Sequence, residues 1–158
     1  MTRQRLLTLV VLGLAVSVVS TLSEAASRRF RVTAELVQST FIGDPDRPQL
    51  GDQSIFNVDL VDKSGARVGT VGASCTIISV PPLDTSDECL FTAVLAKGQL
   101  IFGGVGPSPA VVRAGQVGTT VQRGIVGGTG DFRTARGEVS VVVTGPGLFD
   151  VTFDVRLD

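Results

Sequence analysis

The chain has 158 residues and a formal net charge of −1, and it contains no histidine, tryptophan or tyrosine. Without histidine it cannot build a Ser-His-Asp or Cys-His nucleophile or a histidine metal site, so any proton transfer falls to Asp, Glu, Lys, Cys or water. A charge this close to zero offers no basic surface for nucleic acid or an anionic membrane. We therefore expect no metal, no organic cofactor and no nucleic-acid partner.

The first 25 residues are typical of a signal peptide. Arg3 and Arg5 form a positive start, a long apolar run follows, and small residues end at Ala25, as a signal peptidase requires. We expect cleavage after Ala25, or one residue later, which leaves one exported domain over residues 26–158 with no membrane contact. The alternative is an uncleaved membrane anchor, because the apolar run approaches the roughly 17 residues that span a bilayer.

Beyond residue 25, the composition and the alternation of apolar and polar residues predict strands and no helix. A loop is expected over residues 44–48, which contain two prolines, and a long loop or irregular edge over the glycine- and proline-rich residues 103–118. The expected strands run over residues 29–37, 53–62, 67–80, 88–96, 99–102, 119–126, 137–144 and 149–158. Short turns are expected at 63–65, 81–84, 97–98 and 145–147.

The last expected strand shows the pattern most clearly. Phe149, Val151, Phe153, Val155 and Leu157 alternate with polar residues, so one face is buried and the other is wet. Eight strands in hairpin succession fit a closed barrel or a sandwich, and closure is favoured because it removes exposed strand edges. We predict an all-β fold, an eight-stranded antiparallel up-and-down β-barrel, whose interior is either filled or holds one small ligand. The inward side chains expected to bind that ligand are Phe56, Val58, Ile77, Phe149, Val151 and Phe153.

Two cysteines, Cys75 and Cys89, flank the expected turn at residues 81–84. An even cysteine count in an exported protein favours a disulfide, and a hairpin folded at that turn would set the two residues opposite one another. The alternative is a reactive thiol, which needs a nearby positive group that the sequence does not show.

A dense glycine motif, Gly127-Gly128-Thr129-Gly130-Asp131-Phe132, separates the sixth and seventh expected strands. It lacks the Gly-Lys-Ser/Thr that completes a phosphate-binding loop, and no helix follows it. We interpret it as a tight corner in which Phe132 plugs one end of the barrel.

The same region holds the one dense cluster of both charge signs, formed by Asp131, Arg133, Arg136 and Glu138. Such clusters are commonly solvated ion pairs of small energetic weight. The functional alternative is that Asp131 and Arg136 point into the barrel mouth and orient a polar group of a ligand. Together with Glu35, these two residues are the candidate catalytic side chains.

Three segments resemble a known superfamily. Leu50-Gly51-Asp52, followed by Phe56, Leu60 and Asp62, is similar to LGDLVPFTNKLYD of plant allene oxide cyclases, and Gly69 with Cys75 looks like their next strand, LGITAGIC. The run from Gly127 to Gly137 resembles the GGTGxFxxARG signature of plant dirigent proteins. Bacterial spirotetronate cyclases also resemble this chain in the region of the second and third expected strands. The resemblance covers about residues 30–158 and implies the allene oxide cyclase barrel, an apolar cavity and a homotrimer.

These families hold a flexible reactive molecule in one folded conformation, so that the shape of the pocket selects one product. Where the plant cyclases have an asparagine that helps to hold a water, this chain has Val58. The resemblance therefore implies an exported barrel that binds a small apolar molecule and steers a cyclisation or coupling without a cofactor. The alternative is a non-catalytic structural or interaction protein that retains the barrel without an active site.

Overall fold

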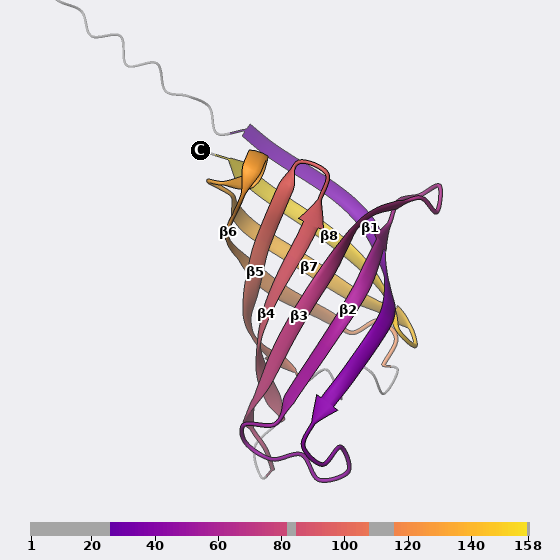
Figure 1. Cartoon of the computed structure of the whole chain (residues 1–158), viewed down its shortest axis with the longest axis vertical. Coiled ribbons are helices and arrows are strands. Elements are labelled where there is room, and N and C mark those ends of the chain that lie inside the picture. Colours follow the sequence, from indigo (N-terminus) through magenta and orange to yellow (C-terminus); the bar gives the residue numbers. More distant parts are fainter. Residues whose placement is uncertain (1–25, 82–84, 108–115, 158) are drawn as a thin grey trace, which may run out of the picture.

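The computed structural model describes residues 26–81, 85–107 and 116–157. These residues form a closed barrel of eight antiparallel strands that follow one another in chain order (Figure 1). The predicted fold class is therefore confirmed. The proposed signal peptide, residues 1–25, lies outside the described residues. The strands are β1 (Ala26–Ile42), β2 (Gln53–Val61), β3 (Arg67–Ser79), β4 (Ser86–Leu95), β5 (Gly98–Pro107), β6 (Thr120–Gly128), β7 (Arg136–Gly145) and β8 (Leu148–Leu157).

The barrel closes because β8 pairs with β1 along its whole length, from Ala26 opposite Leu157 to Glu35 opposite Leu148. This pairing joins the first strand to the last, so that the sheet closes on itself, which is the advantage expected from the sequence. Within the described residues, no helix has the length and apolar character needed to cross a membrane.

The fifth strand is longer than predicted. Residues 103–107 were expected to belong to a loop, yet they continue β5 to Pro107 and pair with β4. A Cβ on Gly103 would collide with the carbonyl oxygen of Cys89, and one on Gly106 would collide with Nη1 of Arg123. The glycines that suggested a loop are thus residues of a strand that other groups approach closely. Residues 108–115 of the expected loop lie outside the described residues.

Cys75 on β3 and Cys89 on β4 are directly opposed in the strand register, with their Cα atoms 4.0 Å apart, and they form the predicted disulfide. The turn at 82–84 that they flank lies outside the described residues. The two cysteines are 14 positions apart in the sequence. The disulfide between them restricts the unfolded chain and so stabilises the fold.

Replacing both cysteines with alanine is expected to lower the free energy of unfolding by about 3 kcal/mol, because the unfolded chain regains the entropy of the open loop. Urea unfolding of the variant and of the wild type, each with and without dithiothreitol, measures the difference. The reductant should lower the wild-type midpoint and leave the variant unchanged. Labelling of two thiols in denatured, unreduced wild-type protein would contradict the disulfide.

One half of the barrel interior is filled by a chain of five phenylalanine rings. Phe30 stacks on Phe153 at 4.8 Å between ring centroids, and Phe153 meets Phe102 edge to face at 5.7 Å. Phe102 stacks on Phe91 at 4.9 Å, and Phe91 meets Phe56 edge to face at 6.0 Å. Such geometries are the favoured arrangements of aromatic pairs. The chain crosses the interior from β1 and β8 to β4, β5 and β2.

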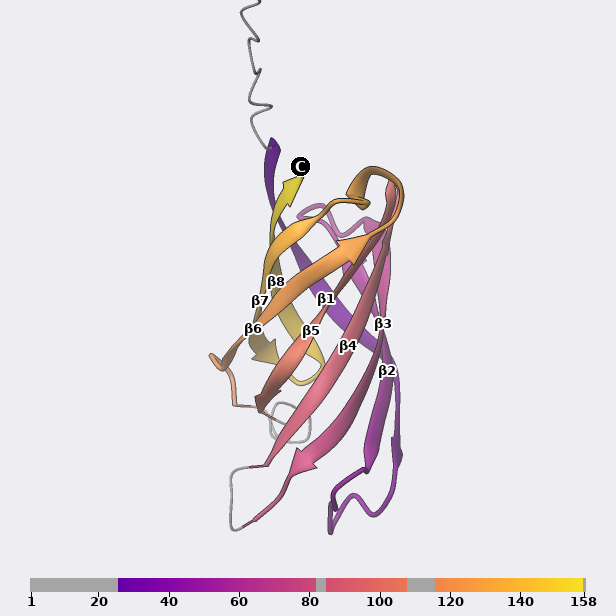
Figure 2. The same cartoon turned by 90° about the vertical axis from the view of Figure 1, so that its left-hand side faces the viewer.

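The glycine motif lies at the end of the barrel where β6 ends. A short 3-10 helix, η1 (Gly130–Phe132), follows β6 there (Figure 2). The backbone amide of Asp131 donates to the carbonyl oxygen of Lys97, and that of Thr129 donates to Gln99, so the corner is fixed to β5 and the turn before it. Phe132 is buried in the hydrophobic core. The motif is therefore a structural corner with a buried plug.

Candidate functional site

A cavity of about 110 Å³ opens at the barrel end opposite η1, where β5 ends at Pro107. Its floor is formed by rings of the aromatic chain, because Phe56, Phe91 and Phe102 all line it. The remaining lining is mostly apolar, with Ser39 and Arg123 as its polar members. The lining residues are Ala34, Leu36, Ser39, Phe56, Val58, Val71, Cys89, Phe91, Phe102, Pro107, Val121, Arg123, Val141, Phe149 and Val151.

Four of the six residues expected to bind a ligand meet at this cavity, namely Phe56, Val58, Phe149 and Val151. The other two are buried elsewhere. Phe153 is fully buried in the core, where it joins two halves of the aromatic chain. Ile77 is buried on β3 and is absent from the lining. Alternation along a strand identifies inward residues, but the depth of each residue along the barrel decides whether it faces core or cavity.

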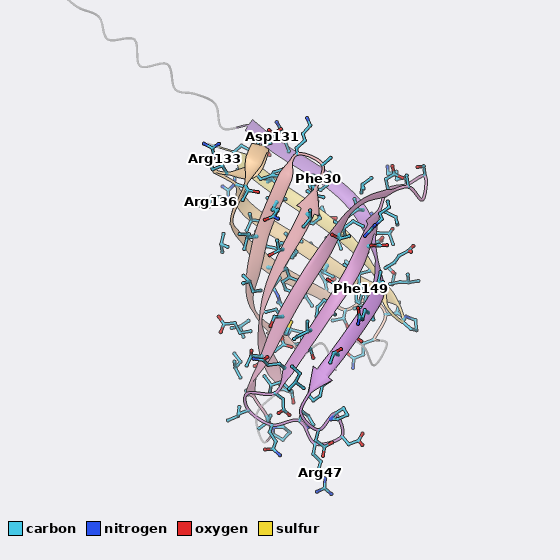
Figure 3. The ribbon with its side chains drawn as sticks, in the orientation of Figure 1. Phe30, Arg47, Asp131, Arg133, Arg136 and Phe149 are labelled. Carbon is cyan, nitrogen blue, oxygen red and sulfur yellow. A yellow bond between two sulfur atoms is a disulfide. The ribbon has the colours of Figure 1, made fainter. Side chains whose placement is uncertain are left out.

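The candidate catalytic residues Asp131 and Arg136 lie at the plugged end, with Arg133 beside them (Figure 3). Asp131 is exposed, and its Oδ2 is 4.0 Å from Nζ of Lys97. Nη1 of Arg136 donates to the carbonyl oxygens of Ala135 at 2.7 Å and Val126 at 3.1 Å.

Glu35 and Glu138 are exposed on β1 and β7. No residue of the charged cluster, and not Glu35, is part of the cavity lining given above. Among the described residues, the one ion pair that involves this cluster joins Asp131 to Lys97, and no ion pair joins two of its members.

Arg123 is the one ionisable side chain among the described residues that line the cavity, and sequence analysis did not select it. It is 6% exposed. Its Nη1 donates to the carbonyl oxygens of Gln122 at 3.1 Å and Val105 at 3.3 Å, while Nε has no hydrogen-bond partner among the described residues. Burial lowers the pKa of the Arg123 guanidinium, and the negative charge of Asp87 partly offsets this shift.

Local structure explains why an arginine fits here. The register between β5 and β6 ends at Gly103 opposite Gly124, so Val105 and Gln122 lie where the two strands have separated. The guanidinium occupies this gap above Gly106, a residue with no side chain to exclude it. A signal was present in the sequence, because Arg123 lies between Val121 and Ile125 at inward positions of an alternating strand.

Asp87 is the second buried charged residue of this end of the barrel, at 1% exposed. Its Oδ1 lies 3.3 Å from Sγ of Cys89. The ligand atoms of Asp87, Cys75 and Cys89 lie within 4.8 Å of one another, but the two sulfur atoms form a disulfide and offer no thiolate to a metal. The group therefore supplies one negative charge beside Arg123.

The fold and the apolar cavity together define a small antiparallel barrel with a hydrophobic chamber that opens at one end. Residues 31–149 match the family described as the allene oxide cyclase barrel like domain. The chain therefore belongs to this family, as the resemblance implied. The specific likeness to dirigent proteins stays a prediction.

Several solved structures share this barrel. A pyocyanin demethylase is 22% identical with a TM-score of 0.68, over 81% of this chain and 99% of that one. An exo-specific intermolecular Diels-Alderase is 15% identical with a TM-score of 0.67, over 83% and 98%. The Diels-Alderase from Streptomyces koyangensis is 18% identical with a TM-score of 0.70, over 84% of this chain and 64% of that one. Identities this low establish the shared fold alone. None of the curated proteins compared with the chain matches it.

Proposed function

We propose that this protein binds a small, largely apolar molecule in the open end of its barrel and holds it in a folded conformation that favours one cyclisation or coupling product. The observation that carries the proposal is the cavity itself, which is lined by aliphatic and aromatic side chains and contains no carboxylate among the described lining residues. Such a site cannot transfer protons through an acidic side chain of its wall. It can accelerate a reaction by confining and orienting the reactant.

The related structures support this proposal. Two of them are named as Diels-Alderases, and a cycloaddition forms its bonds without a proton transfer from the protein. A third is named as a pyocyanin demethylase. A family barrel with a hydrophobic chamber at one end is therefore suited to reactions in which shape selects the product.

The size of the chamber limits what it can enclose. Pockets for drug-sized ligands have volumes of about 300–1,000 Å³, whereas this one holds about 110 Å³. An engineered cavity of about 150 Å³ in another protein binds benzene. The enclosed part thus fits one ring-sized group, and the remainder of a larger molecule would lie in the mouth.

Filling the chamber tests the proposal. Val121 lines the cavity and is 9% exposed, whereas Val126 lies on the outer face of the same strand and is 60% exposed. Val121→Phe is expected to weaken the binding of ethylbenzene about tenfold or more, because the new ring occupies the chamber. Val126→Phe should leave binding unchanged. Ligand titration followed by protein NMR measures both affinities, and equal affinities of the two variants would contradict the proposed site.

The second candidate is a non-catalytic exported structural or interaction protein. The observation that favours it is the small chamber, with the catalytic candidates from the sequence lying away from it. Native mass spectrometry of the protein purified from its source organism distinguishes the two. A co-purified small molecule that is absent from the Val121→Phe variant supports the binding function, and an empty barrel in both supports the alternative.

We also propose that the protein acts outside the cytoplasm. The signal-like residues 1–25 and the disulfide support this, since structural disulfides persist mainly in oxidising compartments. Cleavage after Ala25 would leave β1 intact, because that strand begins at Ala26. N-terminal sequencing of exported protein should therefore begin at Ala26. The homotrimer implied by the resemblance stays a prediction, which light scattering tests.

A further inference from the structure

We infer that the molecule bound in this barrel carries an oxygen that accepts a hydrogen bond, a carbonyl or an oxyanion attached to an apolar ring-sized group, and that Arg123 recognises this oxygen. The inference rests on the proposed binding function and names the chemical class of its ligand. It assigns a role in ligand binding to a charged side chain that also bonds to the β5 backbone.

The first argument is energetic. A buried guanidinium is costly, because it loses the water that solvates it, and a well-packed apolar side chain can often replace it without loss of stability. Arg123 is the one ionisable side chain in a described lining that is apolar apart from Ser39; burial lowers the pKa of its guanidinium, and the charge of Asp87 offsets only part of this shift. An arginine at this position is therefore expected to lower the stability of the fold unless its N–H donors form hydrogen bonds.

The second argument is the count of hydrogen bonds. Nη1 of Arg123 donates to the carbonyl oxygens of Gln122 on its own strand and of Val105 on β5, and the bond to Val105 connects β6 to β5 where the backbone ladder has ended. Nε is buried and lacks an acceptor among the described residues. A buried donor without a partner is unfavourable, and a ligand oxygen beside the guanidinium would supply the missing acceptor.

The third argument is position. Val121 and Phe102 line the cavity together with Arg123, so the side chain lies in the wall of the chamber and not on the outer surface. The guanidinium packs directly against Gly106, where a Cβ would collide with Nη1, and the Cβ position of Gly104 is 4.0 Å from Cδ of Arg123. A ring placed on the aromatic floor would bring a substituent on that ring to the level of this wall.

Three molecules of nearly equal shape test the inference. Benzoate carries an oxyanion, acetophenone carries a neutral carbonyl, and ethylbenzene carries no oxygen. We expect benzoate or acetophenone to bind the wild-type protein about tenfold or more tightly than ethylbenzene, as measured by NMR titration. The stronger of the two identifies the natural ligand oxygen as charged or neutral.

Arg123→Met should abolish this preference while leaving the affinity for ethylbenzene unchanged or higher, because methionine keeps much of the apolar volume and removes the donors. Arg136→Met, at the plugged end, should keep the wild-type preference. If Arg123→Met does not fold, the Nε–H resonance of Arg123 in the wild type gives the answer. It should shift on adding the preferred oxygen-bearing molecule and not on adding ethylbenzene.

The inference is overturned if ethylbenzene binds as tightly as both oxygen-bearing molecules, if the preference survives in Arg123→Met, or if the Nε–H resonance does not respond. In each of these cases ethylbenzene still binds and Val121→Phe still blocks it, so the proposed function stands. If none of the three molecules binds, the proposed function and the inference fail together.

Discussion

Truncation of Phe153 to alanine is expected to lower the free energy of unfolding by about 3–5 kcal/mol, the range typical for a large buried aromatic residue. Phe153 is 0% exposed and contacts the rings of both Phe30 and Phe102. Its removal would leave a void in the middle of the aromatic chain and would separate the rings at the plugged end from those that form the cavity floor. The loss therefore includes both the transfer of the ring and the cavity that remains.

The same truncation at Phe41 provides the matched control. Phe41 is half-buried near the end of β1 and makes none of the ring contacts found among the described residues. Urea unfolding of both variants at constant pH compares the two sites, and Phe41→Ala should cost clearly less. Equal losses at the two positions would show that the aromatic chain has no special weight in the stability of the barrel.

Replacing Gly137 with alanine is expected to destabilise the barrel by roughly 2–4 kcal/mol, combining a strained backbone with steric overlap. Gly137 is the second residue of β7 and has a φ of +131°, a conformation that residues with a Cβ rarely adopt. The added Cβ would also collide with the carbonyl oxygen of Asp154 on β8. This oxygen belongs to the backbone, so it can move only if the strand moves.

Gly124, on the neighbouring strand β6, is the matched control. A Cβ at Gly124 would meet no atom within 4 Å, and its φ is not positive. Gly124→Ala should therefore be neutral, or slightly stabilising because alanine restricts the unfolded chain. Thermal and urea unfolding of the two variants measure the contrast. A Gly137→Ala variant as stable as Gly124→Ala would contradict the strain assigned to the start of β7.

The sequence predicted most of this fold because its strands obey a simple period. Phe149 to Leu157 alternate without exception, and the structure buries that face. The prediction was wrong for residues 103–107, because glycine signals both a turn and a close approach of another chain segment. Only the partner distinguishes the two, and here the partners are the backbone of Cys89 and the guanidinium of Arg123, which are far away in sequence.

The site was predicted less completely than the fold. Periodicity identified the apolar wall, so Phe56, Val58, Phe149 and Val151 were found. It could not tell which inward residues lie above the aromatic floor and which lie beneath it. Asp131 and Arg136 were selected because charged residues are dense around them. Charged residues are, however, common at turns simply because turns are exposed to solvent. Arg123 was missed because its one signal, an inward position in an alternating strand, was overlooked in favour of the denser charges near Asp131.

The plug formed by Phe132 has a kinetic consequence for the reaction proposed here. Phe132 and Phe153 are packed in the core, with Phe30 against them, so a molecule bound as proposed would enter and leave through the mouth at the other end. A product must depart before the next reactant enters, so it would act as a competitive inhibitor of its own formation. Two separate reactants would have to enter one behind the other. A single flexible molecule that reacts with itself needs only one entry step for each turnover. A barrel with one opening is therefore best suited to an intramolecular reaction.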